Sequence, residues 1–243
     1  MTATAFAEPS RQMQIEVLAD ADAVATRAAQ FIAATARAAA AAGDRFTLAL
    51  SGGHTPWQML RVLSSENVPW RSVHLFQVDE RVAPAGDPGR NLTHIHESLL
   101  TRIALPSANL HMMGVEAADL RAAAASYARD LDSFAGAPAV LDLVHLGLGP
   151  DGHTASLVPG DPVLSEVHRD VALTEPYQGH RRLTLTYPIL DRARCVLFVV
   201  TGAEKAAALA KLRARDPGIP ASRVNAARAL IIADAAAAGT AAK

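Results

Sequence analysis

Short β-rich runs alternate with longer alanine-rich stretches along almost the whole chain, and this alternation constrains the fold more than any other feature. It predicts strands at residues 13–18, 46–50, 73–78, 141–146, 183–187, 195–200 and 229–233. It predicts helices at residues 20–42, from Pro56 onward, and at residues 91–102, 117–134 and 203–215. Because alanine is the best helix former, we interpret the alanine-rich stretches as packed helices rather than as low-complexity sequence.

Strands that are separated by helical stretches are typical of βαβ units, which build a mainly parallel sheet. Residues 195–200 form a continuous apolar run, as a parallel strand does when helices cover both of its faces. The sequence therefore predicts an α/β fold, with an open, mainly parallel twisted sheet and helices on both faces, in three layers. The sequence contains no recognisable repeat or linker, so we expect residues 1–243 to form a single α/β domain. Ligands of such sheets bind beyond the carboxyl ends of the strands.

The charge balance and the cysteine content exclude several classes of protein. Lys and Arg together number 23 against 24 for Asp and Glu, and the net charge of −1 gives no electrostatic case for binding nucleic acid or an anionic membrane. The single cysteine cannot form an internal disulfide or a cysteine-based zinc site. Residues 1–14 lack the apolar core of a signal peptide, and no apolar run is long enough to span a membrane. We therefore expect a soluble cytoplasmic protein.

A glycine-rich segment follows the expected strand at residues 46–50 and leads into a helix. It consists of Ser51, Gly52, Gly53, His54, Thr55 and Pro56. Glycines allow backbone N–H groups to turn toward a ligand, hydroxyl groups add donors, and a helix N-terminus attracts negative charge. The segment suits a phosphate cradle, although it also fits an ordinary tight turn between a strand and a helix. No Gly-Lys-Ser/Thr follows, so it is not a Walker loop.

Charged residues follow two other expected strands. Asp79, Glu80 and Arg81 come directly after the third expected strand, where a carboxylate can act on a polar substrate and an arginine can clamp a phosphate. Such a triplet is also common at a solvated strand end. Lys205 stands in the first turn of the helix after the continuous apolar run, where the helix dipole disfavours a cation and a bound anion would offset that cost. A solvent-exposed lysine without a partner is the simpler alternative there.

The segment after the expected strand at residues 141–146 carries the strongest candidates for chemistry. It reads Gly-Leu-Gly-Pro-Asp-Gly-His-Thr from residue 147 to residue 154. Its glycines match the dinucleotide pattern Gly-x-Gly-x-x-Gly, but a proline lies inside the turn and a Pro-Gly pair interrupts the helix that should follow. Asp151 instead stands two residues before His153. An imidazole can act as a general base near neutral pH and a nearby carboxylate can orient it, although a histidine held in a loop only by hydrogen bonds is the alternative.

Taken together, five segments resemble the 6-phosphogluconolactonase family, which belongs to a superfamily with glucosamine-6-phosphate deaminase and ribose-5-phosphate isomerase. The matching segments are residues 51–56, 78–81 with Asn91 downstream, 147–156, 182–186 and 201–209. They occur in the family's order and span nearly the whole chain. The string Gly-Pro-Asp-Gly-His-Thr-Ala-Ser, which ends at Ser156, is the most specific of them.

The resemblance implies hydrolysis of 6-phosphoglucono-1,5-lactone, a phosphosugar lactone, to 6-phosphogluconate in the oxidative pentose phosphate pathway. It implies that His153 is the general base that activates water and that Asp151 orients His153. It also implies that the substrate and its phosphate are bound by Ser51, Gly52, Gly53, His54, Thr55, Asp79, Arg81, Asn91, Arg182 and Lys205. No metal or organic cofactor is implied, since a lactone is already an activated ester, and the resemblance favours a monomer.

The chain departs from the family pattern at two places. Many members carry Lys-Pro-Pro shortly before the fourth matching segment, and here Tyr177 stands about where that lysine would be. Whether Tyr177, His180 or Arg181 takes over the contact of the lysine is left open. The usual Ser-Asn pair is here Arg90-Asn91.

Two rival functions fit parts of the same sequence. An amino-sugar phosphate deaminase or isomerase resembles the chain in its glycine-rich segment, at Asp79 and around His153, and Asp79 could supply the carboxylate base that it needs. Those enzymes carry a glutamate five residues after the histidine, where this chain has Val158, and a tyrosine where it has Arg81. A non-catalytic sugar-phosphate sensor would need a DNA-binding module, and the few residues before the first expected strand form no helix-turn-helix pattern. Val158 and Arg81 both favour the lactonase over the deaminase or isomerase.

Overall fold

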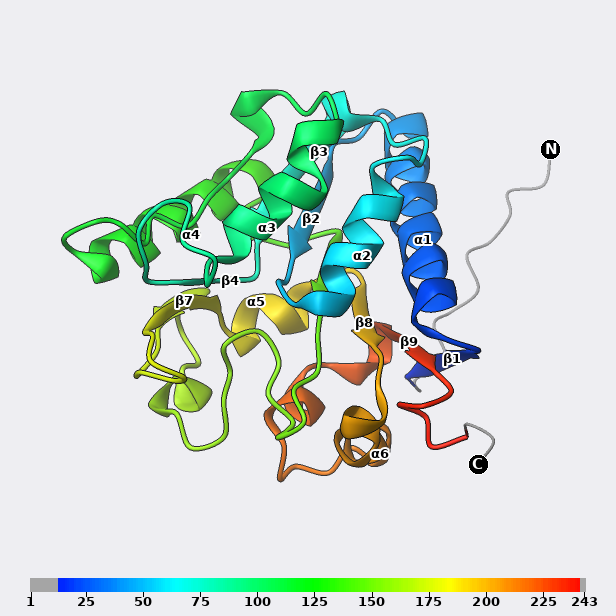
Figure 1. The fold of residues 1–243 in the computed structure, drawn as a ribbon. Coiled ribbons are helices and arrows are strands. Elements are labelled where there is room, and N and C mark those ends of the chain that lie inside the picture. The colour runs from blue at the N-terminus through cyan, green and yellow to red at the C-terminus, as the bar shows by residue number, and fades with distance from the viewer. Residues whose placement is uncertain (1–12, 241–243) are drawn as a thin grey trace.

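Six parallel strands form the central sheet of the protein. The structure is a computed structural model and describes residues 13–240. The strands lie in the order β1 (Gln14–Leu18), β9 (Ala229–Asp234), β8 (Val196–Val200), β5 (Leu143–Leu146), β2 (Phe46–Leu50) and β3 (Val73–Gln77). Every neighbouring pair runs parallel, which confirms the expected mainly parallel α/β sheet (Figure 1).

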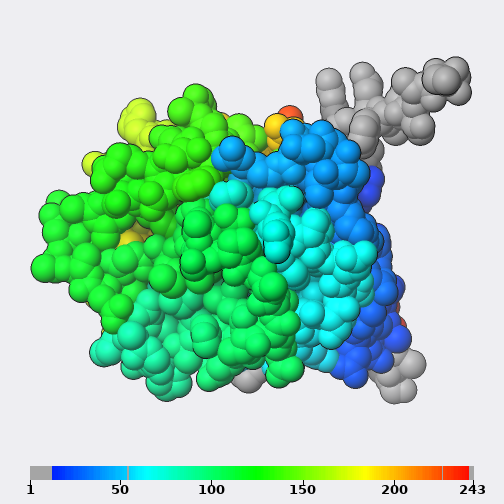
Figure 2. Space-filling model, turned by 90° about the horizontal axis from the view of Figure 1, so that it is seen from above, coloured from blue at the N-terminus to red at the C-terminus, as the bar shows by residue number. Residues whose placement is uncertain are grey.

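Helices cover both faces of this sheet, as the sequence predicts. The core of one face includes α1 (Ala21–Ala41), α2 (His54–Leu63) and α3 (Asn91–Ser98), and the core of the other includes α4 (Leu120–Ala135), α5 (Tyr187–Arg192) and α6 (Ala206–Ala214). Successive side chains of a strand alternate between the two cores, so that in β2 Leu48 and Leu50 point to the first and Ala49 to the second. On the surface seen from above, the N-terminal part, coloured blue to cyan, lies beside the green middle part of the chain (Figure 2).

A second, antiparallel sheet extends the protein beyond the end of β3. It contains β4 (Asp79–Arg81), β7 (Arg182–Leu185) and β6 (Val171–Leu173), in that order. Val78 links the two sheets, because its N–H donates to the Leu50 carbonyl at 2.9 Å and its own carbonyl accepts from Leu185 N at 2.8 Å. The expectation of a half-buried strand at residues 183–187 is therefore wrong in part, since all of β7 is buried and Tyr187 begins α5.

Several helices begin or end a few residues from the expected positions. The side-chain carboxylates of Asp20 and Asp119 cap the starts of α1 and α4. The first residue of α4, Leu120, lies three residues after the expected start of that helix. α2 begins two residues before Pro56. α3 and α6 are shorter than expected because part of each stretch forms a 3₁₀ turn, at Leu100–Arg102 and Ala203–Lys205 respectively. Between residues 13 and 240, no helix is both long enough and apolar enough to cross a membrane.

Candidate functional site

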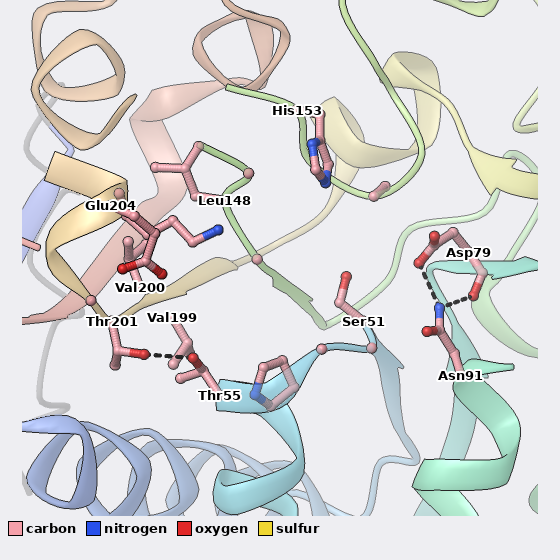
Figure 3. A pocket seen from close by; sticks show the side chains of 18 of the residues that line it. Ser51, Thr55, Asp79, Asn91, Leu148, His153, Val199, Val200, Thr201 and Glu204 are labelled. Atoms are coloured by element: carbon pink, nitrogen blue, oxygen red, sulfur yellow. Dashed lines mark hydrogen bonds between the residues drawn. The ribbon is translucent and has the colours of Figure 1, made fainter. Parts of the chain in front are cut away.

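A cavity of about 490 Å³ lies at the carboxyl end of the parallel sheet. β8, β5 and β2 are neighbours in that sheet, so the loops that follow them meet at one edge of it. The three loops begin at Thr201, Gly147 and Ser51 and line the cavity together with residues of β4 and β7 (Figure 3). The second sheet therefore completes a cavity whose position follows from the order of the parallel strands.

Most of the site residues expected from the sequence line this cavity. Those that do are Ser51, Gly52, Gly53, Thr55, Asp79, Arg81, Asn91, His153, Arg182 and Lys205. Asp151 reaches the site through its contact with His153. His54 begins α2, and its side chain lies outside the described part of the structure. Among residues 13–240, no group of three or more His, Cys, Asp and Glu side chains is placed to hold a metal ion.

His153 and Asp151 form a hydrogen-bonded pair. His153 Nδ1 lies 2.6 Å from Asp151 Oδ1, and the backbone N–H of His153 donates to the same oxygen at 3.1 Å. Burial favours a higher pKa for Asp151, but hydrogen bonds from His153, the His153 charge and a hydrogen bond from Tyr177 outweigh it, so the pKa lies below its usual value. An ionised carboxylate only accepts hydrogen bonds, so His153 Nδ1 carries the proton of this contact, and in the neutral form of the ring Nε2 has the lone pair. This is the tautomer that a general base needs.

Glycines in the loop after β5 permit the close turn that holds this pair. Gly149 N donates to the His153 carbonyl at 2.8 Å, and a Cβ on Gly149 would stand 2.1 Å from His153 Nδ1. Gly152 has a φ of +84°, which residues with side chains rarely adopt. Residues 147–161 are all described and contain no helix, so these glycines do not open the strand–turn–helix unit of a dinucleotide site.

The loops after β2 and β8 join at the side of the cavity across from His153 (Figure 3). Thr55 Oγ1 and Thr201 Oγ1 share a hydrogen bond of 2.5 Å. Thr55 lies in the first turn of α2, whose N-terminal N–H groups carry a partial positive charge. Lys205 lines the same cavity. Hydroxyl groups, a helix N-terminus and an ammonium group together suit an anion such as phosphate.

Two buried side chains support these loops and were missed in the sequence analysis. Asp234, at the end of β9, accepts from Gly202 N at 3.1 Å and from Ala237 N at 2.7 Å, and so fixes the loop after β8. His145, inside β5, accepts from Ser51 N through Nδ1 at 3.3 Å. Burial lowers the pKa of His145 to about 3, so its ring is neutral and able to accept. Gly202 and Ser51 lie in loops far along the chain from Asp234 and His145, and no local pattern marks either buried residue.

Asp79 is buried and held by neighbouring donors. Asn91 Nδ2 donates to Asp79 Oδ1 at 3.1 Å and to its carbonyl oxygen at 2.9 Å, and Ser156 Oγ donates to Asp79 Oδ2 at 2.6 Å. Only 5% of Asp79 is exposed. Because each carboxylate oxygen already accepts a hydrogen bond, Asp79 is better suited to holding the site in place than to removing a carbon-bound proton.

Glu80, the middle member of the charged triplet, is fully buried and caps a helix. Its carboxylate accepts from Asn91 N and Leu92 N at 2.8 Å each, which satisfies two N–H groups at the start of α3. It also accepts from Arg81 N and Gln77 Nε2 at 2.8 Å. Glu80 therefore fixes the end of α3 from which Asn91 reaches Asp79.

Arg81 and Arg182 bring positive charge to the cavity from the second sheet, where they are paired across β4 and β7. Arg81 Nη1 donates to the Gly89 carbonyl at 2.5 Å, and Arg182 Nη2 to the Tyr177 carbonyl at 3.5 Å. The Nε atoms of both are buried and have no hydrogen-bond partner among the described residues. Burial, together with the charge of Arg81, lowers the pKa of Arg182. Two adjacent guanidinium groups with unused donors favour an anionic ligand.

Similarity to known proteins extends over most of the chain. The family model described as glucosamine-6-phosphate isomerases/6-phosphogluconolactonase matches residues 19–232. The 6-phosphogluconolactonase of Synechocystis sp. is 37% identical over 207 residues, which are 84% of this chain and 86% of that protein. The solved structure of 6-phosphogluconolactonase from Trypanosoma brucei has a TM-score of 0.85 at 26% identity, over 96% of this chain and 100% of that one.

The fold alone is shared with a further enzyme. The structure of a monomeric glucosamine-6-phosphate deaminase has a TM-score of 0.81 at 21% identity, over 94% of this chain and 100% of that one. The fold is therefore common to two kinds of phosphosugar chemistry, and the side chains in the cavity have to distinguish them.

Proposed function

The chain belongs to the family of glucosamine-6-phosphate isomerases and 6-phosphogluconolactonases, and we propose that it hydrolyses 6-phosphoglucono-1,5-lactone to 6-phosphogluconate with His153 as the general base. The observation that carries this proposal is the 2.6 Å contact between His153 Nδ1 and Asp151 Oδ1 beside a cavity lined by cationic side chains. The reaction is the lactone-opening step of the oxidative pentose phosphate pathway.

In this hydrolysis a single side chain, His153, first accepts and then returns a proton. His153 Nε2 takes a proton from a water molecule while the water oxygen bonds to the lactone carbonyl carbon. The resulting tetrahedral intermediate collapses when the bond between that carbon and the ring oxygen breaks, and the ring oxygen receives the proton from His153. The ionised Asp151 stabilises the imidazolium that exists between these two steps.

The phosphate anchors the substrate far from the reacting carbon. The glycine-rich loop, Thr55 and Lys205 offer N–H, hydroxyl and ammonium donors on the side of α2, and Arg81 and Arg182 add positive charge. Energy from these contacts positions the carbonyl against His153, because binding of a remote group can be used to orient the reacting atoms. We propose a monomer as the active unit, since the side chains of Thr55, Arg81, Arg182 and Lys205 from one chain already supply the donors that the phosphate needs.

A deaminase or isomerase of the same family is the alternative, and two features of the site argue against it. Such an enzyme needs a carboxylate that removes a carbon-bound proton, whereas both carboxylate oxygens of Asp79 accept hydrogen bonds from Asn91 and Ser156. The position five residues after His153 holds Val158, which is buried and apolar. Lactone hydrolysis requires no such carboxylate.

The proposal is tested by comparing substrates. Freshly generated 6-phosphogluconolactone is expected to open faster with the wild-type protein than spontaneously, while glucono-1,5-lactone, which lacks the phosphate, is accelerated far less. Glucosamine 6-phosphate serves as the control for the alternative and is expected to release no ammonia. Ammonia release without acceleration of lactone opening would contradict the proposal, and size-exclusion chromatography of the active sample tests the monomer.

A further inference from the structure

The hairpin between β6 and β7 ends in a tight turn that carries Tyr177 to the site. Tyr177 N donates to the His180 carbonyl at 2.9 Å, and His180 N donates back to the Tyr177 carbonyl at 3.2 Å. Between them Gln178 and Gly179 have φ values of +51° and +83°, the pair of left-handed residues that a type I′ turn requires. Because the backbone of this turn is closed by two hydrogen bonds, the direction of the Tyr177 side chain is well defined.

The Tyr177 side chain contacts both members of the proposed catalytic pair. Its hydroxyl donates to Asp151 Oδ2 at 3.2 Å, the carboxylate oxygen that is not used by His153. Its ring stands edge to face with the His153 ring, with 5.8 Å between centroids and an angle of 65° between planes. On β7, the Arg182 guanidinium lies 5.1 Å from the centroid of the Tyr177 ring. The ring therefore packs against both an imidazole and a cation.

We propose that Tyr177 is a positioning residue for the hydrolysis, which holds Asp151 Oδ2 so that Oδ1 keeps His153 in the Nδ1-protonated tautomer. This inference rests on the proposed function, because it assigns a role in the same reaction. It also gives Tyr177 a role at the position where the resemblance leads us to expect a lysine. A phenol cannot offer the positive charge of a lysine, and its hydroxyl is already directed to a carboxylate rather than to a substrate anion.

The direction of this hydrogen bond follows from the groups around the phenol. Gln178 Nε2 donates to the Tyr177 hydroxyl oxygen at 3.3 Å, which leaves the hydroxyl proton for Asp151. Burial raises the pKa of Tyr177 and the charge of Asp151 raises it further, while Arg182 works in the opposite direction. At neutral pH the phenol is therefore protonated and Asp151 is ionised, and the contact is a donor–acceptor pair.

Charged groups of both signs lie behind this contact. Arg182 lies beyond the Tyr177 ring, and the charges of Asp79 and Arg81 act on Arg182 in opposite directions. On the side of His153, the facing titratable groups are Asp151 and Tyr177. Removal of the hydroxyl alone therefore removes its hydrogen bond to Asp151 and the one that it accepts from Gln178, and it changes no formal charge.

Tyr177→Phe removes that hydroxyl and keeps the ring, so it separates the hydrogen bond from the packing. The primary readout is a ¹³C NMR titration of the Asp151 carboxyl in the ligand-free protein, which does not depend on activity. Because the Tyr177 hydrogen bond lowers the pKa of Asp151, the titration of Asp151 is expected to move to higher pH in the variant. The ¹⁵N shifts of His153 are expected to show a smaller fraction of the Nδ1-protonated tautomer.

Kinetics provide the second readout. We expect kcat to fall about two- to tenfold, the range that one net hydrogen bond supplies, with KM nearly unchanged because Tyr177 does not hold the phosphate. Gln178→Ala keeps the phenol but removes the donor that directs it, and is expected to change the Asp151 titration and kcat in the same direction and by less.

The outcomes distinguish this inference from the proposed function. An unchanged Asp151 titration and an unchanged His153 tautomer in folded Tyr177→Phe overturn the positioning role, whatever happens to the rate. A rise of KM without a change of kcat also overturns it and makes Tyr177 a binding residue. If the Asp151 titration differs between Tyr177→Phe and wild type but the wild type does not open the lactone, the contact is supported and the proposed function is contradicted instead.

Discussion

Gly52 and Asn91 approach each other so closely that a Cβ on Gly52 would stand 1.9 Å from Asn91 Oδ1. Gly52 belongs to the loop after β2, and Asn91 is the first residue of α3. The amide of Asn91 in turn donates to Asp79 at the start of the second sheet. The absence of a side chain on Gly52 is therefore what lets the phosphate-side loop, a helix and the second sheet meet at one point.

Gly52→Ala is expected to displace the Asn91 amide, because a contact of 1.9 Å cannot be absorbed without movement. Overpacking of this kind costs about 1–3 kcal/mol of unfolding free energy, and we expect kcat/KM to fall at least about tenfold through the loss of ordered positions in the cavity. Urea unfolding and lactone hydrolysis measure the two effects. The control is Gly114→Ala, where a Cβ would meet only Ala123 Cβ at 3.7 Å. If Gly52→Ala has the unfolding free energy and kcat/KM of wild type, as we expect for Gly114→Ala, the claim that Gly52 must lack a side chain next to Asn91 is contradicted.

Asp151→Asn removes the negative charge next to His153 without changing the size of the side chain. An amide can turn its NH₂ group toward His153 Nδ1 and so stabilise the tautomer that is protonated on Nε2, which cannot act as a base. We expect kcat to fall about a hundredfold or more, with a much smaller change in KM. The measurement is a kcat and KM determination near neutral pH, and a kcat within twofold of wild type would rule out the orienting role.

His145 gives the protein a defined loss of stability in acid. Its pKa is lowered from 6.5 to about 3 by burial, so below pH 6.5 the unfolded chain binds a proton that the folded chain does not. The folded state therefore loses stability as the pH falls from 6.5 toward 3, by up to about 1.4 kcal/mol per pH unit. His145→Gln does not titrate, and its amide oxygen can still accept from Ser51 N.

The measurement for His145 is the free energy of unfolding in urea at pH 7, 6 and 5, for wild type and His145→Gln. The variant is expected to lose less stability than the wild type as the pH falls, so that the two curves converge or cross. Parallel curves over this range would mean that His145 does not carry the titration.

Lys205→Met tests the phosphate side of the cavity. Methionine keeps the length of the side chain and removes the ammonium charge, and a contact made equally in the ground and transition states affects KM and not kcat. We expect KM for the phosphorylated lactone to rise about tenfold or more, the effect of losing one charge-assisted contact, with kcat changed little. The matched control is Lys211→Met, because Lys211 is an exposed lysine of α6, the helix that follows Lys205, and does not line the cavity. Equal KM values for the two variants would place the phosphate elsewhere.

Much of the site could be predicted from the sequence because of the parallel sheet. The loops that begin at Ser51, Gly147 and Thr201 were recognised one at a time, and each follows a strand. Since parallel strands end at the same edge, loops far apart in the chain had to converge, and the cavity confirms that they do. The contact between Asp151 and His153 could be predicted for another reason, because the two residues are two positions apart in one glycine-rich turn.

The remaining parts depend on contacts between distant segments. The strands of the second sheet are three or four residues long, and in residues 79–81 charge hides the strand pattern. Ser156 reaches Asp79 across 77 positions of the chain, and Glu80 caps a helix that begins eleven residues later. Tyr177 becomes a partner of Asp151 only after β6 and β7 pair. Such partners are set by the assembled fold, and neither periodicity nor local motifs encode them.

The most direct test of the central claim is lactone hydrolysis by His153→Ala, compared with wild type and with His168→Ala, an exposed histidine outside the cavity. Fresh 6-phosphogluconolactone is opened by each protein at the same concentration, and the spontaneous rate is subtracted. The account predicts that wild type and His168→Ala accelerate opening equally, and that folded His153→Ala loses about a hundredfold or more of kcat. Full activity of His153→Ala would contradict the assignment of His153 as the general base, and no acceleration by the folded wild type would contradict the lactonase function itself.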